Sequence, residues 1–279
     1  MEANGGKLIP RRRGARALPV DFLVDARLDA AQGLVWDDRT YRLYWIDSPA
    51  SRLFSVSLTS GVVQSWTLPC PVGAIALCDD GRLLAMLLDG FYLFGPATQD
   101  LHFFAGLDQP WSSDCMHGEV GPDGAFWISG IWSGAIGSFM RLAPDGRGDM
   151  VDASAPSDPG AGIDRATMKG ADLATGAQRA AVGQGAMDVE GAYWRCDHIN
   201  GCVGRFSPDS QLLQRVALPV PAPTTCCFGG AAMNLLFVGS RRIVSGSTPL
   251  GRRPASGGIM MVALDVSGVR QPRFRPHPR

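Results

Sequence analysis

Short runs of alternating apolar and polar residues, separated by Asp and Gly turns, follow one another along most of this chain. A typical unit has a glycine and an apolar run, then an Asp-Asp, Asp-Gly or Glu-Gly turn, then an aromatic run such as Arg42–Ile46. Two apolar runs around such a turn predict a β-hairpin with one buried face. In the first unit, two more strands are predicted over Leu53–Leu58 and Val62–Leu68. No stretch has the period of an amphipathic helix, so we predict an all-β protein.

The hairpin unit recurs along the chain. Its copies begin at Gly33, Gly73, Gly118, Gly185 and Cys227, which are 40, 45, 67 and 42 residues apart. Four short strands with a period near 40 residues are typical of one blade of a β-propeller. The interval of 67 residues is too long for one blade and too short for two. Within it, Arg147–Ala181 has almost no strand pattern. We therefore predict a six-bladed β-propeller with five intact units and an eroded fourth blade.

Composition supports short strands and narrows the class of protein. The 279 residues include 35 Gly and 20 Pro, both of which are unfavourable in long helices. Lys and Arg number 26 and so do Asp and Glu, which argues against nucleic-acid binding by bulk charge. No apolar stretch is long enough to span a bilayer, and no secretory signal is found, so we expect no membrane partner. Seven cysteines without a Cys-x-x-Cys pair indicate a reducing, cytoplasmic location.

The two ends of the chain differ from the repeats. Residues 1–17 and 270–279 are basic, contain Pro or Gly and lack an evident apolar face, so both are predicted to be disordered tails. Residues 18–269 are predicted to form a single propeller domain. An eroded blade would expose the strand edges of its neighbours, so oligomerisation through the damaged blade is an expected consequence.

Five stretches carry a resemblance to a known family. They are Asp25–Asp47, Pro71–Pro96, Gly118–Trp132, Glu190–Trp194 and, as the most specific, Leu218–Arg241. Together they resemble the family of senescence marker protein (regucalcin), gluconolactonase and luciferin-regenerating enzyme. The resemblance implies a six-bladed propeller with one divalent metal, calcium or zinc, in its central tunnel. It also implies hydrolysis of sugar lactones or small esters, with a small-molecule substrate in the tunnel and the metal polarising the carbonyl oxygen.

The family's metal ligands are changed in this chain. The position of the metal glutamate is occupied by Gln32, and that of the metal aspartate by Gln184, or else by Gly183. The metal asparagine has no counterpart in the eroded segment. A hard divalent cation prefers charged oxygen ligands, and each lost carboxylate removes several kcal/mol of attraction. We therefore predict a weak or empty metal site, and a lactonase activity that is reduced or lost.

The residues that the resemblance places at the substrate entrance of the tunnel are also changed in this chain. The family's arginine, asparagine and lysine positions are occupied by Asp114, Met116 and Glu119. Because a histidine near carboxylates can transfer protons, Asp114, His117 and Glu119 form a candidate catalytic set. We assign Met116, and more distantly Asp197 and His198, to substrate binding.

The alternative is that these side chains have no role in catalysis or binding and are solvent-exposed charges at the edge of the propeller or residues of turns. Three functions therefore stay open at this point. The chain could be a metal-dependent lactone hydrolase, a metal-independent enzyme that uses the remodelled tunnel, or a non-catalytic propeller.

Overall fold

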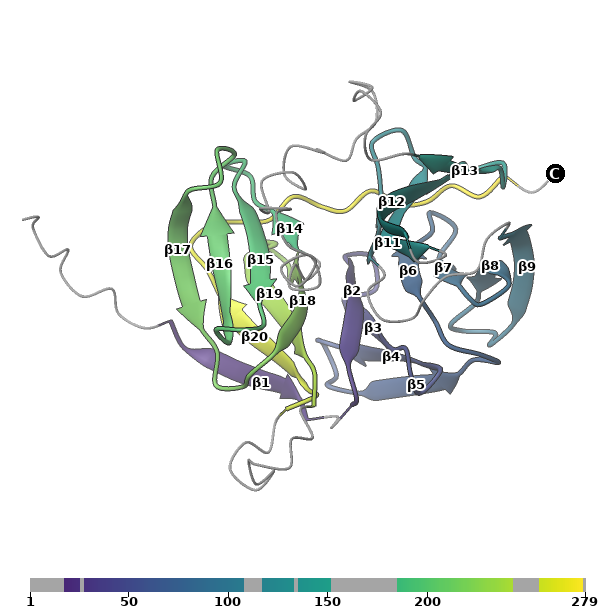
Figure 1. Cartoon of the computed structure of the whole chain (residues 1–279). Helices are drawn as coiled ribbons and strands as arrows, with labels where there is room; N and C mark the ends of the chain where they lie inside the picture. The colour runs from purple at the N-terminus through teal and green to yellow at the C-terminus, as the bar shows by residue number, and fades with distance from the viewer. Residues whose placement is uncertain are drawn as a thin grey trace, which may run out of the picture.

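The computed structural model describes residues 18–25, 28–107, 117–132, 135–151, 185–242 and 256–277. These residues form twenty β-strands in five four-stranded antiparallel sheets, which are the blades of a β-propeller (Figure 1). The described part of the chain contains no helix of the length and apolar character that crossing a membrane requires. Because every regular element among the described residues is a β-strand, the predicted all-β class is confirmed.

Four of the blades are continuous in sequence, with the first strand of each on the inside. The first blade has β2 (Ala31–Asp37), β3 (Arg42–Asp47), β4 (Arg52–Ser57) and β5 (Val63–Thr67). The second has β6 (Ala74–Leu77), β7 (Leu83–Met86), β8 (Gly90–Phe94) and β9 (Leu101–Gly106). The third has β10 (His117–Val120), β11 (Phe126–Trp132), β12 (Ala135–Leu142) and β13 (Gly148–Val151). The next has β14 (Ala186–Met187), β15 (Tyr193–Asp197), β16 (Cys202–Phe206) and β17 (Leu212–Ala217).

The last blade combines the two ends of the domain. Its strands β18 (Pro223–Gly229), β19 (Leu235–Ser240) and β20 (Ile259–Ala263) are followed outward by β1 (Val20–Val24). Val20 pairs with Val262 in this antiparallel contact. The hydrogen bonds between β1 and β20 therefore tie the beginning of the described chain to its last blade.

The five predicted repeat units correspond to the five observed blades. Each predicted start falls within an innermost strand or directly before it, and the strands predicted over Leu53–Leu58 and Val62–Leu68 are β4 and β5. Innermost strands of neighbouring blades pack on one another from β14 through β18, β2 and β6 to β10. The blades thus form an arc whose ends are the β14 blade and the β10 blade. Between neighbouring blades lies the core, with fully buried side chains such as Trp45, Trp194 and Phe237.

The region predicted to be an eroded fourth blade lies mostly outside the described residues, which stop at Val151 and resume at Gly185. One part of that prediction is wrong. Arg147–Ala181 was expected to have almost no strand, yet β13 (Gly148–Val151) is the outer strand of the third blade. Pairing with the long strand β12 stabilises a Gly-Asp-Met-Val sequence that has little strand pattern of its own.

The C-terminal end also differs from the expected disordered tail. Arg270–His277 lies against the blades, and Phe274 is fully buried and pairs with Cys78 in a parallel bridge. A single phenylalanine provides the apolar contact, while Arg273 forms ion pairs with Asp37 and Asp38. Residues 1–17, the other predicted tail, lie outside the described residues.

Candidate active site in the central tunnel

A small cavity lies where the innermost strands of the first three blades meet the C-terminal segment. It is lined by Val35 of β2, by Ile75, Ala76 and Leu77 of β6, by Gly118, Glu119 and Val120 of β10, and by Gln271 and Pro272. Its volume of about 10 Å³ is room for roughly one water molecule. Most of the lining is apolar, and Glu119 and Gln271 are its polar side chains.

Glu119 is the charged residue of this cavity. On β10 it stands between the buried residues Gly118 and Val120, and its own side chain remains in contact with solvent. Protein nevertheless surrounds it closely, and the resulting desolvation raises the pKa of its carboxyl group. No other described residue forms a hydrogen bond or an ion pair with this carboxylate. Glu119 is thus poised to bind a water molecule or a ligand.

Glu119 and Tyr193 interact electrostatically although they belong to the two end blades of the described arc. Glu119 belongs to the β10 blade and Tyr193 to β15 of the β14 blade. Burial raises the pKa of the Tyr193 hydroxyl, and the nearby Glu119 carboxylate raises it further. The two groups are therefore close enough to interact electrostatically.

Gln32 occupies the position implied for the metal-binding glutamate. It lies near the start of β2, opposite Ile46 of β3, and is half-buried. The β2–β3 register shifts just after it, and Gly33 has a φ of +58°, a left-handed conformation that favours glycine. This bulge bends the strand at the Gln32 position.

The described residues contain no cluster of charged metal ligands. Gln32 offers one neutral oxygen, and the described part of the chain has no group of three His, Cys, Asp or Glu side chains that could hold a metal ion. The second predicted position, Gln184, and its alternative Gly183 both lie outside the described residues.

The other predicted site residues are only partly placed. Asp114 and Met116 lie outside the described residues. His117 is half-buried at the start of β10, two residues from Glu119, but it does not line the cavity. Asp197 accepts hydrogen bonds from the backbone N–H groups of Ile199 and Asn200 and from the Asn200 amide. Burial alone would raise the pKa of Asp197, but these bonds lower it.

Asp197 and His198 thus lie at the turn between β15 and β16, away from the cavity lining. The geometry gives Asp197 a clear role in holding that turn. The predicted contact of either residue with a substrate stays a prediction.

Sequence reasoning missed a recurring ion pair next to the blade hairpins. Asp188 has a fully buried side chain and accepts hydrogen bonds from Trp194 Nε1 at 2.9 Å and from Arg205 Nε at 2.7 Å. The β10 blade repeats this arrangement, since Asp123 accepts hydrogen bonds from the Trp127 indole and the Arg141 guanidinium. The signal in the sequence is an Asp just before the turn (Asp188) or within it (Asp123), a Trp on the next strand and an Arg on the strand after it. These carboxylates are fully engaged in structure, which sets them apart from Glu119.

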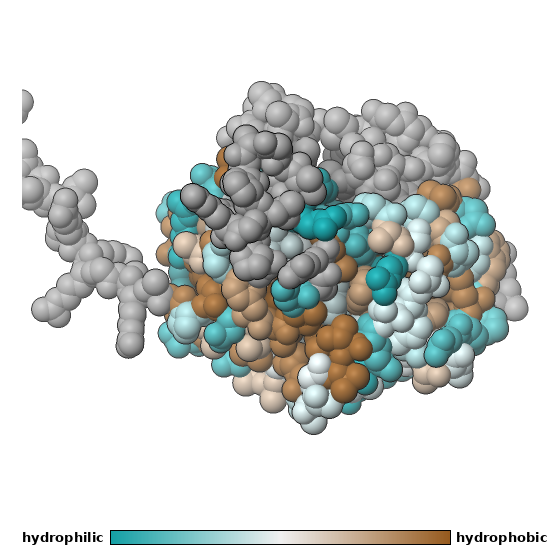
Figure 2. Space-filling view, turned by 90° about the horizontal axis from the view of Figure 1, so that it is seen from below, coloured by the Kyte–Doolittle hydropathy of each residue, from teal (hydrophilic) through white to brown (hydrophobic). Residues whose placement is uncertain are grey.

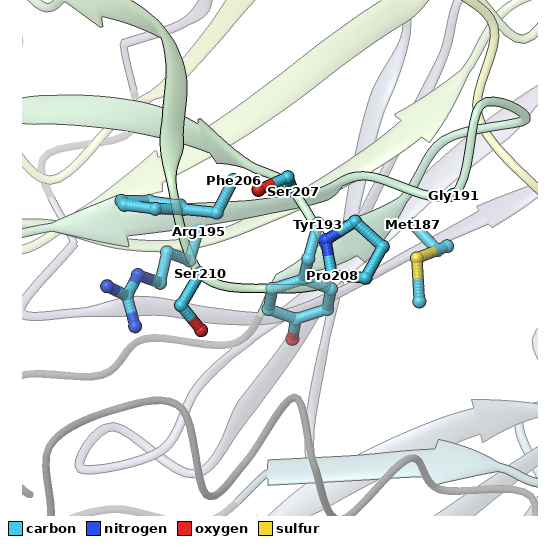
Figure 3. A pocket seen from close by; sticks show the side chains of 8 residues that line it. All are labelled: Met187, Gly191, Tyr193, Arg195, Phe206, Ser207, Pro208 and Ser210. Carbon is cyan, nitrogen blue, oxygen red and sulfur yellow. The ribbon is translucent and has the colours of Figure 1, made fainter.

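A second hollow lies on the β14 blade (Figure 3). It is lined by Met187, Gly191, Tyr193, Arg195, Phe206, Ser207, Pro208 and Ser210. The Arg195 guanidinium lies over the Phe206 ring, 4.1 Å from its centroid. None of the described residues that line this hollow has a carboxylate or an imidazole group.

Large apolar side chains are also exposed on the outer strands. Phe22 of β1, Val63 of β5, Phe103 of β9 and Leu212 of β17 are each about half exposed or more. On the face shown in Figure 2, hydrophobic and hydrophilic surface areas alternate over short distances. Scattered apolar residues of this kind are normal on a folded domain.

Comparison with known proteins places these observations in a family. A profile of the SMP-30/Gluconolactonase/LRE-like region matches residues 30–169 and 168–242. The chain is 27% identical to 6-deoxy-6-sulfogluconolactonase of Pseudomonas putida, over 86% of this chain and 93% of that one. It is 25% identical to regucalcin of Xenopus laevis, over 92% and 99% of the two chains. L-arabinolactonase of Azospirillum brasilense is 24% identical, over 92% and 96%.

Two solved structures share the fold. A calcium-binding protein, regucalcin from Agrobacterium tumefaciens, has a TM-score of 0.75 at 21% identity, covering 93% of this chain and 98% of that one. Luciferin-regenerating enzyme has a TM-score of 0.72 at 16% identity, covering 93% and 100%. With most of its length matched by the family profile, the chain belongs to the SMP-30/gluconolactonase/LRE-like family of β-propellers.

Proposed function

We propose that this protein hydrolyses small cyclic esters of the sugar-lactone type in its central tunnel, with Glu119 as the acid–base group. The observation that carries the proposal is the Glu119 carboxylate, which has no partner among the described residues and lies in a mostly apolar cavity of about one water's size. The names of two relatives, a sulfogluconolactonase and an arabinolactonase, support lactones as the substrate class.

The chemistry requires one water and one proton acceptor. In the proposed reaction, Glu119 takes a proton from the water as the water oxygen bonds to the lactone carbonyl carbon. The ring C–O bond then breaks, and the proton passes to the ring oxygen to give a hydroxy acid. A carboxyl group whose pKa is raised is a stronger base than an ordinary glutamate, which suits this role near neutral pH.

Gln32 would act as a hydrogen-bond donor, which an ionised glutamate cannot do. Its carboxamide N–H can donate a hydrogen bond to the carbonyl oxygen on which negative charge develops. In the family, a divalent metal polarises that oxygen. Because the described residues offer one neutral oxygen at this position, the proposed steps use only Glu119, Gln32 and water.

A non-catalytic, ligand-binding propeller is the second candidate. The replacement of a charged metal ligand by Gln32 favours it, because the family's reaction depends on that ligand. A binding protein of this kind would retain affinity for lactones or hydroxy acids without turning them over. A metal-independent enzyme acting on another small molecule in the same tunnel would instead need Glu119.

The experiment is a pH-indicator assay on a panel of aldonolactones that includes a sulfonated one. It is run with chelator and, separately, with added calcium or zinc. The proposal expects turnover that survives chelation and falls at least about 100-fold in Glu119→Gln, the usual scale of acid–base catalysis. Asp265→Asn, at an exposed position outside the tunnel, is the charge-matched control. Full activity in folded Glu119→Gln, or activity that requires added metal, would refute the proposed steps.

A further inference from the structure

The C-terminal segment Ser267–His277, here called the strap, contacts all five described blades. At the start of the strap, Ser267 accepts a backbone hydrogen bond from Val189, and Val269 donates one to Met187. Val189 and Met187 belong to the β14 blade. Gly268 donates to Met233 of the last blade at 2.7 Å. Figure 1 shows the strap in yellow, running from the β14 side of the arc to the β12–β13 side.

The far end of the strap is held by the second and third blades. Phe274 donates a backbone hydrogen bond to Leu77 at 2.8 Å and accepts one from Asp79 at 3.0 Å. Its ring packs edge-on against Phe104, with ring centroids 5.6 Å apart. His277 donates to the carbonyl oxygen of Pro144 in the β10 blade. The strap therefore links the two end blades of the described arc and contacts each blade between them.

The middle of the strap is held in another way. Between Val269 and Phe274, no backbone hydrogen bond is found to any described residue. Instead, Arg273 Nη2 lies 2.5 Å from Asp37 Oδ1 and 2.6 Å from Asp38 Oδ1, and Arg270 also pairs with Asp38. The blades are held by continuous ladders, whereas the middle of the strap depends on ion pairs, of which the Arg270–Asp38 pair is exposed enough for salt to screen it.

The strap also forms a wall of the cavity that contains Glu119. Gln271 and Pro272 line that cavity from the strap side. Cys78 lies beneath the strap, fully buried, and forms the parallel bridge with Phe274. If the strap detached, Cys78 would become accessible, and the cavity would open from this side.

We propose that the strap is a releasable floor of the tunnel, which detaches from the blades while the five sheets stay folded. Elements with few backbone hydrogen bonds open at lower free energy than a continuous sheet. The Arg270 and Arg273 ion pairs act as the latch, and high ionic strength, which screens the exposed Arg270 pair, favours the open form. The inference does not depend on the reaction proposed above.

Labelling of Cys78 tests this directly. The full chain is treated with N-ethylmaleimide under native conditions, and peptide mass spectrometry follows each cysteine. Cys226 and Cys227 are buried within the sheets and report whether the blades stay folded. We expect Cys78 to react faster than these two in the unmodified protein, and faster still in 0.5 M salt.

Variants test the latch. Arg273→Gln should speed Cys78 labelling about tenfold, equivalent to 1.4 kcal/mol, with Cys226 and Cys227 unchanged. Arg242→Gln is the matched control, because it removes an exposed ion pair with Asp29 and does not touch the strap. Phe274→Ala provides a second route to the open form.

Two results would overturn the proposal. One is a Cys78 that reacts no faster than Cys226 in the unmodified protein at any salt concentration. The other is joint labelling of Cys78 and Cys226 in the strap variants, which would mean that the strap opens only when the whole domain unfolds. The measurement on the unmodified protein decides the question even where a variant fails to fold.

Discussion

Arg273 and Asp37 form an ion pair across 236 residues of sequence, with 2.5 Å between Nη2 and Oδ1. Asp37 ends the first strand of the first blade, and Arg273 lies in the strap. Their side chains are 13% and 10% exposed, so both charges are largely removed from water. Each charge needs the other, because an unpaired charge in this environment would be poorly solvated.

Removing the Arg273 charge should therefore lower stability measurably. We expect Arg273→Met to reduce the free energy of unfolding by about 2 kcal/mol, below the range for fully buried pairs because some solvent reaches this one. Urea denaturation followed by tryptophan fluorescence measures the change. Arg270→Met is the control, since Arg270 is 66% exposed and its loss should cost less than about 0.5 kcal/mol. Equal effects of the two substitutions would contradict the role given to Arg273.

Acid should destabilise the β14 blade through Asp188. Burial alone would raise the pKa of Asp188, but hydrogen bonds and the charge of Arg205 lower it below its usual range. A depressed pKa stabilises the fold above the unfolded-state value of 3.8, and that contribution is lost as pH falls through the folded-state value. In Asp188→Asn, the free energy of unfolding should be lower at pH 7 and should change less between pH 5 and pH 2. An unaltered pH profile in this variant would contradict the assignment.

Glu119 should have the opposite effect on stability. Desolvation raises the pKa of its carboxyl group, so the folded state binds the proton more tightly than the unfolded state does. The ionised Glu119 carboxylate therefore destabilises the fold as pH rises above 4.5, the ordinary pKa of a glutamate. Glu119→Gln should raise the melting temperature at pH 8 but have little effect at pH 4, as followed by calorimetry. A lower melting temperature at pH 8 would mean that the carboxylate has a stabilising partner.

Two buried tryptophans should respond differently to the same substitution. Trp194 Nε1 donates to Asp188 at 2.9 Å, whereas Trp45 Nε1 is buried and has no hydrogen-bond partner among the described residues. Both indoles are fully buried, so replacement by Phe removes a similar volume from each site. Trp194→Phe should cost about 1–3 kcal/mol more than Trp45→Phe, because it also removes a hydrogen bond to a charged group. Chemical denaturation of the two variants gives the difference, and equal costs would refute the explanation.

Calcium binding should depend on the residue at position 32. We expect titration calorimetry to detect no tight calcium binding by the unmodified protein, and Gln32→Glu to increase the affinity, because a charged oxygen ligand replaces a neutral one. Gln32→Met serves as a control of similar size without a ligand oxygen. Micromolar binding that Gln32→Met abolishes would show that the carboxamide is a sufficient ligand.

The blade units could be predicted because their signals are local. Asp-Gly turns such as Asp123-Gly124, flanked by apolar runs, specify a hairpin from neighbouring residues alone, and their spacing indicates the blades. That Gln32 stands where the resemblance implies a metal-binding glutamate stays a prediction. The strand β13 could not be predicted from local signals, because its Gly-Asp-Met-Val sequence becomes a strand only through its pairing with β12.

The sequence by itself determined the all-β class and the five hairpin units, because each follows from the chemistry of residues close together in the chain. Only the tertiary structure decided that β1 completes the last blade, that Phe274 and Arg273 hold the strap in place, and that Glu119 lies in a cavity walled by Gln271. Those features depend on contacts between residues far apart in sequence. Their energies come from burial and charge pairing, which exist only once the blades have assembled.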